Sequence, residues 1–412
     1  MTASGVRWPV VLSALCGGAA ASMQIGKASA AIPVLRSEFA LTITEASLYL
    51  ALFSLGAALL GLPLGLAARR FGVLRAGIAG LSLIAGASLI GAMIDKWPII
   101  LACRMVESLG LPLVVTTMPA LVQAAAGPER RQLVGGIWAS WLPLGVALAL
   151  FLSVSLLDQA SGRRDLFLWS GIVPLLAIGG LLLSRPAAPA ATEWVRSGRL
   201  KAEVWMMSGA FLLFSGINLI VTGFLPSIAE ADLGLSQRYA ALYGGFAALL
   251  IIAGNMVAVV YLTRGVSTHR LLSLGFLGMG FCSALFLVSI LPVSSRIVGG
   301  MGFQICVGIV PGVLWAQVPL LVQRSGRSAP FIASLYYQAG GIGQVAGPLM
   351  AAAAVDITGT WAGSLGIIGP SAFLGGFVAL WLKARDRDTT VPEPRTCGRP
   401  RDRPMSWCRC FR

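Results

Sequence analysis

Three ionisable residues, Lys27, Arg104 and Glu107, lie inside long apolar stretches of the chain. Lys27 follows Gln24 by about one helical turn, and Arg104 and Glu107 are three residues apart, so each pair would share one face of a helix. A charge at the centre of a membrane helix costs about 2.5–3.5 kcal/mol on insertion scales, so such a group usually faces protein or water and has a function. A buried ammonium group suits a negatively charged solute, and a buried carboxylate can exchange a proton.

Each of these residues also has a purely structural explanation. Lys27 could extend its ammonium group to the outer membrane interface, because Pro33 follows closely in the sequence. Arg104 and Glu107 could neutralise each other within their helix, and a buried ion pair is weak evidence of anything more. Both explanations remain open: Lys27 is an anion ligand or an interface residue, and Glu107 exchanges a proton that Arg104 senses or forms a local ion pair.

Further polar and aromatic residues within the apolar stretches could face a solute. Amide side chains can hydrogen-bond a ligand, although in membrane proteins they more often join helices. Aromatic rings can form the walls of a cavity, although packing is their commoner role. The substrate-binding candidates are Gln24, Lys27, Trp138, Trp141, Asn218, Gln304, Tyr337 and Gln338. Pairs of small residues, Gly136 with Ser140 and Gly343 with Gly347, predict places where helix backbones approach closely.

Twelve apolar stretches position these residues, and each is long enough to cross a bilayer as a helix of about 20 residues. The chain is 57% hydrophobic and 11% charged, whereas soluble proteins are nearer a quarter charged. Uniformly apolar runs lack the alternation of a membrane barrel, so we predict an all-α integral membrane protein. The predicted spans are 9–32, 46–67, 73–94, 98–125, 133–157, 166–184, 204–229, 238–262, 270–291, 296–322, 329–354 and 362–383.

The second six stretches repeat the first six. Trp8, Pro33, Tyr49, Arg104, Pro119 and Gln123 recur as Trp205, Pro226, Tyr243, Arg296, Pro319 and Gln323. The repeat predicts two six-helix bundles, 1–184 and 204–384, joined by a cytoplasmic linker at 185–203 and followed by a disordered basic tail at 385–412. Internally repeated membrane proteins often place a substrate site where the repeats meet, so the repeat favours transport.

The positive charge follows the predicted topology. The net charge is +15, and most Lys and Arg residues fall on one side of the membrane if the N-terminus is cytoplasmic. Cytoplasmic loops of membrane proteins carry this excess. We therefore expect a multi-pass protein of a bacterial inner membrane with both termini in the cytoplasm, and not a nucleic-acid-binding protein.

No pattern in the sequence indicates an enzyme. The chain has one His, no Walker motif and no nucleophile next to a base. We therefore expect no cofactor and no metal, and transport would be driven by a gradient. The expected partners are a small-molecule substrate, protons and the lipid bilayer, and we expect a monomer.

Two motifs resemble those of a known family. Gly65-Leu-Ala-Ala-Arg69-Arg70-Phe-Gly72, between the second and third spans, and Arg104-x-x-Glu107-Ser108-x-Gly110, in the fourth, are similar to motifs of the major facilitator superfamily. The resemblance implies twelve helices, alternating access and a gating loop formed by Gly65, Arg69, Arg70 and Gly72. The family's loop motif has an acidic residue where this chain has Arg69, so this gate would be held differently. Gln338-x(4)-Gly343-Gln-Val-Ala-Gly347-Pro348 resembles the cyanate/nitroimidazole-type permeases.

These observations lead to one hypothesis and one alternative. The hypothesis is a proton-coupled permease for a small organic or inorganic anion, in which Lys27 faces the solute and Glu107 with Arg104 couples protons. The alternative is a proton-driven exporter of hydrophobic or cationic compounds, which the aromatic residues favour and Lys27 opposes.

Overall fold

Long helices make up nearly all of the described chain. The computed structural model describes residues 5–157, 162–186, 200–326 and 329–388. Twelve helical segments there are long and apolar enough to cross a membrane, which confirms the predicted all-α fold class. The helices of the first half are α1 (Trp8–Phe39), α2 (Ile43–Leu52), α3 (Leu55–Phe71), α4 (Val73–Ala92), α5 (Trp97–Ala124), α6 (Arg131–Trp138), α7 (Trp141–Leu156) and α8 (Gly162–Ser184). Those of the second half are α9 (Ala202–Leu233), α10 (Gln237–Thr263), α11 (Thr268–Leu287), α12 (Val293–Ala316), α13 (Val318–Ser325), α14 (Ala329–Thr358) and α15 (Leu365–Asp388).

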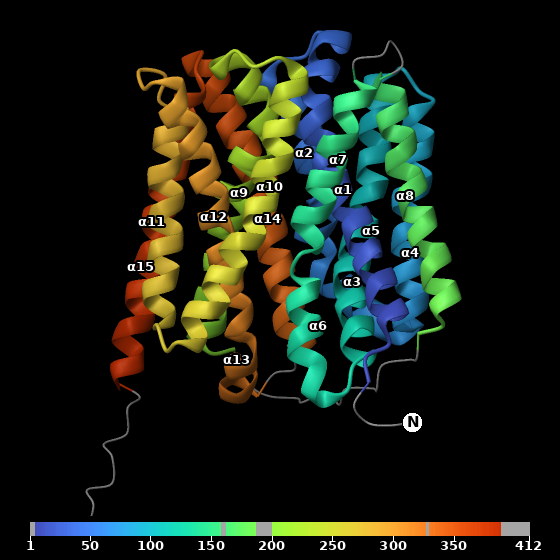
Figure 1. Cartoon of the computed structure of the whole chain (residues 1–412), viewed down its shortest axis with the longest axis vertical. Coiled ribbons are helices and arrows are strands. Elements are labelled where there is room, and N and C mark those ends of the chain that lie inside the picture. Colours follow the sequence, from blue (N-terminus) through green and yellow to red (C-terminus); the bar gives the residue numbers. More distant parts are fainter. Residues whose placement is uncertain (1–4, 158–161, 187–199, 327–328, 389–412) are drawn as a thin grey trace, which may run out of the picture.

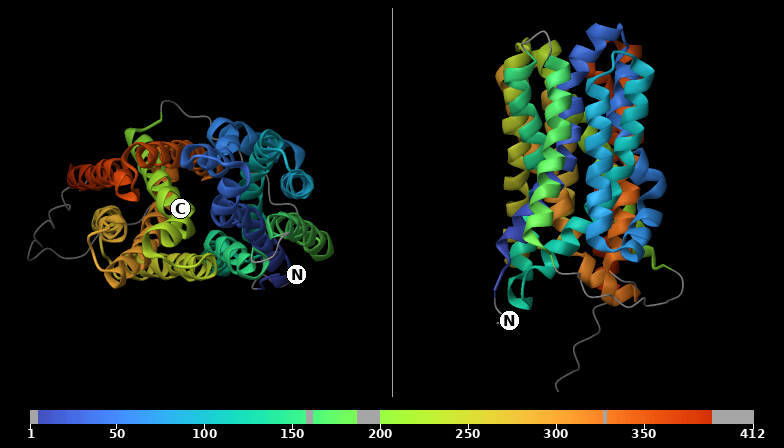
Figure 2. Two further views of the ribbon diagram at one scale, coloured as in Figure 1. Left: turned by 90° about the horizontal axis from the view of Figure 1, so that it is seen from above. Right: turned by 90° about the vertical axis from the view of Figure 1, so that its right-hand side faces the viewer.

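The helices stand roughly parallel and form two groups that meet along the middle of the molecule (Figure 1). Seen from above, the helices before α9 lie on one side and those from α9 onward on the other (Figure 2). Across the boundary α2 and α3 pack on α14, α7 packs on α10, and α1 packs on α9. The helices α1 and α9, which begin the two repeats, are the most deeply buried spans. Most of the predicted linker and tail lies outside the described residues.

Three predicted spans are interrupted in the structure, so the prediction of a continuous helix is wrong for each of them; the second span breaks between α2 and α3 at Phe53 and Ser54, and the other two breaks lie near prolines. The fifth span breaks between α6 and α7 at Ala139 and Ser140, and the tenth breaks between α12 and α13 at Gln317. Each of these two breaks precedes a proline, Pro143 or Pro319, which has no N–H to donate to the carbonyl four residues earlier. The prolines thus turn the chain within spans that hydropathy alone describes as uniform.

Glycines let helices touch at the backbone. A Cβ atom at Gly343 of α14 would overlap the carbonyl oxygen of Leu212, and one at Gly347 would lie 2.7 Å from the carbonyl oxygen of Gly216 on α9. The prediction of close packing at these two glycines is confirmed. The prediction at Gly136 is wrong, because nothing lies within 4 Å of a Cβ placed there.

Replacing Gly343 by alanine should therefore lower the free energy of unfolding by about 1–3 kcal/mol, the usual cost of forcing extra atoms into a packed interior. The matched control is Gly179→Ala on α8, where a Cβ meets nothing within 4 Å. Denaturant titration of the two purified variants in detergent measures the difference. Equal stability of the two variants would contradict backbone contact between α9 and α14.

Candidate functional site

A carboxylate and two cations form a buried cluster between α1, α4 and α5. Lys27 Nζ lies 2.6 Å from Glu107 Oε1, and Arg104 Nη1 lies 2.6 Å from Glu107 Oε2. Ser88 Oγ donates to Glu107 Oε1 at 2.6 Å and accepts from Lys27 Nζ at 2.9 Å. None of the three charged side chains is more than 2% exposed. The alternative that Lys27 extends to the membrane interface is therefore wrong. We call Lys27, Arg104 and Glu107 the charge cluster.

Gln24 holds the polar surroundings of this cluster in place. Its Oε1 lies 3.1 Å from Ser88 Oγ, and its Nε2 donates to the carbonyl oxygen of Ser170 on α8 at 2.8 Å. Gln24 and Lys27 do share one face of α1, as their spacing predicts. Because its amide is occupied on both sides, Gln24 is a positioning residue in this conformation.

Arg104 also joins α5 to two backbone carbonyls of other helices. Its Nη2 donates to the carbonyl oxygen of Gln24 at 2.9 Å, and its Nε donates to that of Tyr49 at 2.7 Å. Tyr49 lies just before the break between α2 and α3 at Phe53 and Ser54, which interrupts the second predicted span. The guanidinium group lies over the rings of Tyr49 and Phe53, at 4.5 and 4.4 Å from their centroids. Arg104 thus fixes α1 and this break relative to α5.

The second repeat contains a corresponding arginine with a different acid. Arg296 Nε donates to the carbonyl oxygen of Phe286 at 2.9 Å, and Arg296 Nη2 lies 3.1 Å from Asp232 Oδ2 at the end of α9. Arg296 is 3% exposed, so it is buried within the bundle. The sequence repeat predicted this arginine as the counterpart of Arg104. Its acidic partner, Asp232, belongs to another helix, so the spacing of residues around Arg296 could not predict the pair.

A cavity of about 2390 Å³ lies between the two halves. Its inner part is lined by Ile25, Leu111 and Ile251, near the middle of their helices. From there it extends to the end of the bundle where Arg70, Gly72, Glu129, Arg130 and Arg131 line it. We call this the basic end; α6, α13 and the start of α1 lie there (Figure 1).

The predicted site residues divide between the cavity wall and the interior. The cavity is lined by Trp138, Trp141, Asn218 and Tyr337 among the substrate-binding candidates, and by Arg70 and Gly72 of the predicted gating loop. It is not lined by Gln24, Lys27, Gln304, Gln338, Arg104 or Glu107. Gly65 and the side chain of Arg69 lie outside the part of the chain whose burial the structure describes. The roles predicted for all of these residues remain predictions.

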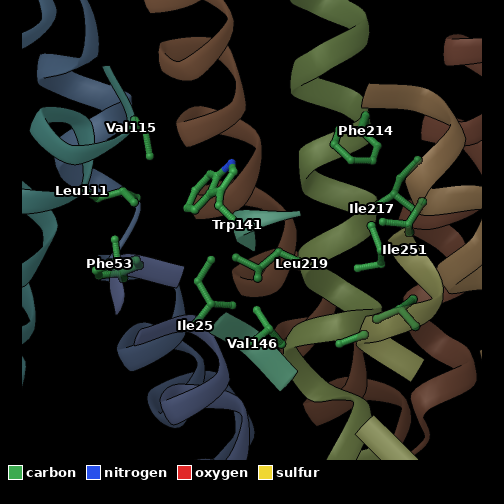
Figure 3. Close-up of a cluster of buried hydrophobic side chains, with 14 of the residues drawn as sticks. Ile25, Phe53, Leu111, Val115, Trp141, Val146, Phe214, Ile217, Leu219 and Ile251 are labelled. Carbon is green, nitrogen blue, oxygen red and sulfur yellow. The ribbon is translucent and has the colours of Figure 1, made fainter. Parts of the chain in front are cut away.

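An apolar layer separates the charge cluster from the cavity. Ile25 is the residue after Gln24, and Leu111 lies one helical turn beyond Glu107; both line the cavity. Figure 3 shows these two side chains with Val146 of α7 and other buried apolar residues. In this conformation a solute in the cavity therefore meets hydrocarbon at this point, and the charges lie behind it.

Away from the basic end the two halves are joined by hydrogen bonds. Ser29 Oγ on α1 donates to the carbonyl oxygen of Gly223 on α9 at 2.5 Å. At the far end of the bundle the backbone N–H of Thr44 on α2 donates to Asp356 Oδ2 on α14 at 3.0 Å. Phe151 and Phe246 pack edge to face between α7 and α10, with ring centroids 5.2 Å apart. The cavity thus reaches one end of the bundle, and contacts between the halves close the other.

Several cavity-lining residues were missed in the sequence, among them Phe211, Phe214 and Ser215. With Asn218 these three occupy positions i, i+3, i+4 and i+7 of α9, which form one helical face. This spacing was a usable signal, but the aromatic and small residues of an apolar helix are usually read as packing.

Comparison with known proteins agrees with this architecture. The sequence model described as the Major Facilitator Superfamily matches residues 11–348. A solved structure described as a bacterial homolog to the human lysosomal transporter Spinster, in an inward-facing and unoccupied conformation, is similar to this chain with a TM-score of 0.75 and 15% sequence identity. The match covers 94% of this chain and 99% of that chain, and at this identity it concerns the fold alone. No curated protein matches the sequence. The narrower resemblance to cyanate/nitroimidazole-type permeases stays a prediction.

Proposed function

Because this chain belongs to the Major Facilitator Superfamily, we propose that it is a secondary active transporter that moves a small organic solute across a bacterial inner membrane by alternating access. The observation that carries the proposal is the cavity between the halves, which reaches only one end of the bundle. A transporter of this kind must expose one central site to each side of the membrane in turn. A site that is open at one end and closed by inter-half contacts at the other is one of the two states required.

The basic end is the cytoplasmic end in this proposal. Arg70, Arg130 and Arg131 line the mouth of the cavity there, and positive residues collect on the cytoplasmic side of membrane proteins. The conformation is then the inward-open one, with Ser29 and Thr44 making contacts that close the periplasmic side. Both termini would be cytoplasmic, as the sequence predicts.

The charge cluster is the proposed coupling element. One carboxylate serves two cations, so the cluster retains one positive charge when Glu107 is ionised. A proton on Glu107 would remove the counter-ion that Lys27 and Arg104 share and leave two like charges in contact. Because Arg104 also holds the carbonyls of Gln24 and Tyr49, that repulsion would act on α1 and α2. A proton would then shift the balance between the two conformations, which is what coupling requires.

The remaining positive charge supports an anionic solute, the substrate class that the sequence predicts. In the present conformation Lys27 is already bound to Glu107 and does not line the cavity. An anion would therefore have to reach Lys27 in another conformation, after Glu107 has taken up a proton. The second candidate is export of hydrophobic compounds, which the mostly apolar and aromatic inner wall of the cavity favours.

Flux measurements on proteoliposomes test the proposed function. A panel of anions, neutral solutes and cations is first screened for thermal stabilisation of the purified protein, since a ligand at about 100 times its dissociation constant adds about 2.7 kcal/mol. Uptake or export of each stabilising solute should then follow an imposed pH gradient. In the compensated double variant Lys27→Met/Glu107→Gln, which keeps the net charge of the cluster, any remaining flux should no longer respond to the gradient. Flux that responds equally in the double variant would remove Glu107 from coupling, and solutes that bind without any flux would refute transport.

A susceptibility panel in cells without native efflux pumps separates the two candidates. Protection against several unrelated hydrophobic compounds would favour export. Stabilisation by anions that disappears in Lys27→Met would favour the anion permease.

A further inference from the structure

The cavity wall of the second half carries a group of aromatic rings. Phe211, Trp315 and Tyr337 line the cavity, and Trp315 packs against both of the others, at 5.9 Å from Phe211 and 5.3 Å from Tyr337 between ring centroids. Behind them Tyr336 stacks on Phe211 at 5.4 Å with an interplanar angle of 17°. In the first half Trp138 and Trp141, which also line the cavity, stack at 5.5 Å and 14°. Both halves thus present ordered π-surfaces to the cavity.

Glycines on neighbouring helices leave the space in which these rings pack. A Cβ atom at Gly340 of α14 would lie 2.7 Å from Phe211 Cε1 and 3.0 Å from Ser215 Oγ. A Cβ atom at Gly18 of α1 would lie 2.7 Å from Trp138 Cη2. Any larger residue at either glycine would displace a ring, so the rings are held against the neighbouring helix backbone. Rings that are fixed in place lose little entropy when a flat ligand packs on them.

A polar group without a partner lies beside the rings. Ser215 is 1% exposed and lines the cavity, and within the described chain its hydroxyl has no hydrogen-bond partner. A buried polar group of this kind is rare, and a hydrogen-bonding substituent of a solute in the cavity would give it a partner. One turn further along α9, Asn218 also lines the cavity, and its Oδ1 accepts from Thr222 Oγ1 at 2.8 Å. A ligand substituent at this place would meet a hydroxyl and an amide.

The charged residues that line the cavity lie elsewhere. Among the described lining residues they are Arg70, Glu129, Arg130 and Arg131, which lie at the basic end, at the end of α3 and beside the start of α6. The aromatic wall itself therefore offers no counter-ion to a charged group. A charge placed there would lose its hydration without compensation, whereas a neutral hydrogen-bonding group would not.

We propose that this wall binds an uncharged planar aromatic solute: its ring stacks on Phe211, Trp315 and Tyr337, and a neutral hydrogen-bonding substituent pairs with Ser215 and Asn218. Trp138 and Trp141 cover the ring from the other half when the cavity closes. The proposal rests on the proposed transport function and names the substrate class of its cavity. It differs from the anion hypothesis because it places recognition on α9, α12 and α14, and not at the charge cluster.

Three matched probes test the proposal on the purified full-length chain. Benzamide has an aromatic ring and a neutral amide, cyclohexanecarboxamide keeps the amide but has no aromatic ring, and benzoate keeps the ring but is charged. Ligand-dependent shifts of the unfolding temperature give the three dissociation constants. We expect benzamide to bind about three- to ten-fold more tightly than cyclohexanecarboxamide, as aromatic contact predicts, and also more tightly than benzoate. Equal binding of the two amides, or tighter binding of benzoate, would overturn the proposal.

Matched variants locate the binding. Phe211→Leu and Ser215→Ala should each weaken benzamide about three- to ten-fold, as the loss of one ring contact or one hydrogen bond predicts. The controls are Phe281→Leu, at a ring that is 66% exposed on α11, and Ser208→Ala, whose hydroxyl bonds only to the carbonyl of Val204 in its own helix. The controls should leave benzamide binding unchanged. Ser215→Ala removes only a hydroxyl group that has no partner, so this variant should fold. It therefore tests the proposal even if Phe211→Leu is unstable.

The outcomes separate this proposal from the proposed function. Benzamide binding that weakens in Phe211→Leu and Ser215→Ala but not in their controls supports the subsite. Binding that is lost only in Lys27→Met overturns it in favour of the charge cluster. If none of the probes binds while another solute is carried across proteoliposomes, the subsite proposal fails and the transport function stands.

Discussion

The variant Glu107→Gln is expected to lose about 3–5 kcal/mol of unfolding free energy, because it leaves two buried cations without their shared counter-ion. Lys27 and Arg104 each lie 2.6 Å from a different oxygen of this carboxylate, and both are 0% exposed. Glutamine keeps the size of the side chain but replaces one acceptor oxygen by an NH2 donor that faces a cation, so the loss would report the lost charge and acceptor and not packing. Denaturant titration of the purified variant in detergent, monitored by tryptophan fluorescence, measures it.

Removing one cation gives the control for this prediction. Lys27→Met leaves one carboxylate for one guanidinium group, so the cluster becomes neutral. The large cost of removing one member of a buried ion pair comes from the charge left unpaired, and here Arg104 and Glu107 remain paired. We therefore expect Lys27→Met to be close to wild-type in stability. Arg104→Met also makes the cluster neutral, but it leaves the carbonyls of Gln24 and Tyr49 without the Arg104 donors, so it should be less stable than Lys27→Met.

The double variant completes the cycle. Lys27→Met/Glu107→Gln keeps one buried cation, as in the wild-type balance, and it should recover part of the stability lost in Glu107→Gln. If Lys27→Met alone were as damaging as Glu107→Gln, the excess positive charge would not explain the cluster. The packing of Lys27 over the ring of Phe167, at 4.8 Å from its centroid, would then dominate.

The spans could be predicted because a hydrocarbon slab imposes length and composition on every helix that crosses it. The breaks within spans were harder. Pro143 and Pro319 stood in the sequence, but other prolines such as Pro33 and Pro226 lie inside continuous helices. The break at Phe53 has no proline near it; there the free carbonyl of Tyr49 is taken by Arg104, a residue of another helix. The hydropathy of the span cannot predict that contact.

The sequence predicted many of the residues of the candidate site, but few of the contacts between them. The local pair of Arg104 and Glu107 follows from helical spacing, and it forms. The pair of Lys27 and Glu107 joins residues 80 positions apart, so only the packing of α1 against α5 brings them together. From the sequence, Lys27 had no predicted counter-ion, because Glu107 was predicted to pair with Arg104. Trp138 and Tyr337 reached the cavity wall because the two repeats face each other there.

A reversible cross-link between Thr44→Cys and Asp356→Cys is expected to abolish transport. These residues belong to different halves and meet at the end of the bundle opposite the cavity mouth, where the N–H of Thr44 donates to Asp356 Oδ2 at 3.0 Å. If that end must open for the cavity to face the other side, a covalent bridge across it holds the protein in the present conformation. The measurement is flux of a transported solute into proteoliposomes before and after treatment with a short bifunctional methanethiosulfonate.

A bridge within one half should leave transport unchanged. Met93→Cys and Arg164→Cys give such a bridge, because Arg164 Nη2 lies 3.5 Å from Met93 Sδ at the same end of the bundle and both belong to the first half. Both pairs are introduced in a chain whose seven cysteines are replaced by alanine. Flux should stop only for the bridge between halves and return after reduction with dithiothreitol. Undiminished flux with a complete bridge between Thr44→Cys and Asp356→Cys would mean that the halves do not separate at this end, and alternating access through this cavity would be refuted.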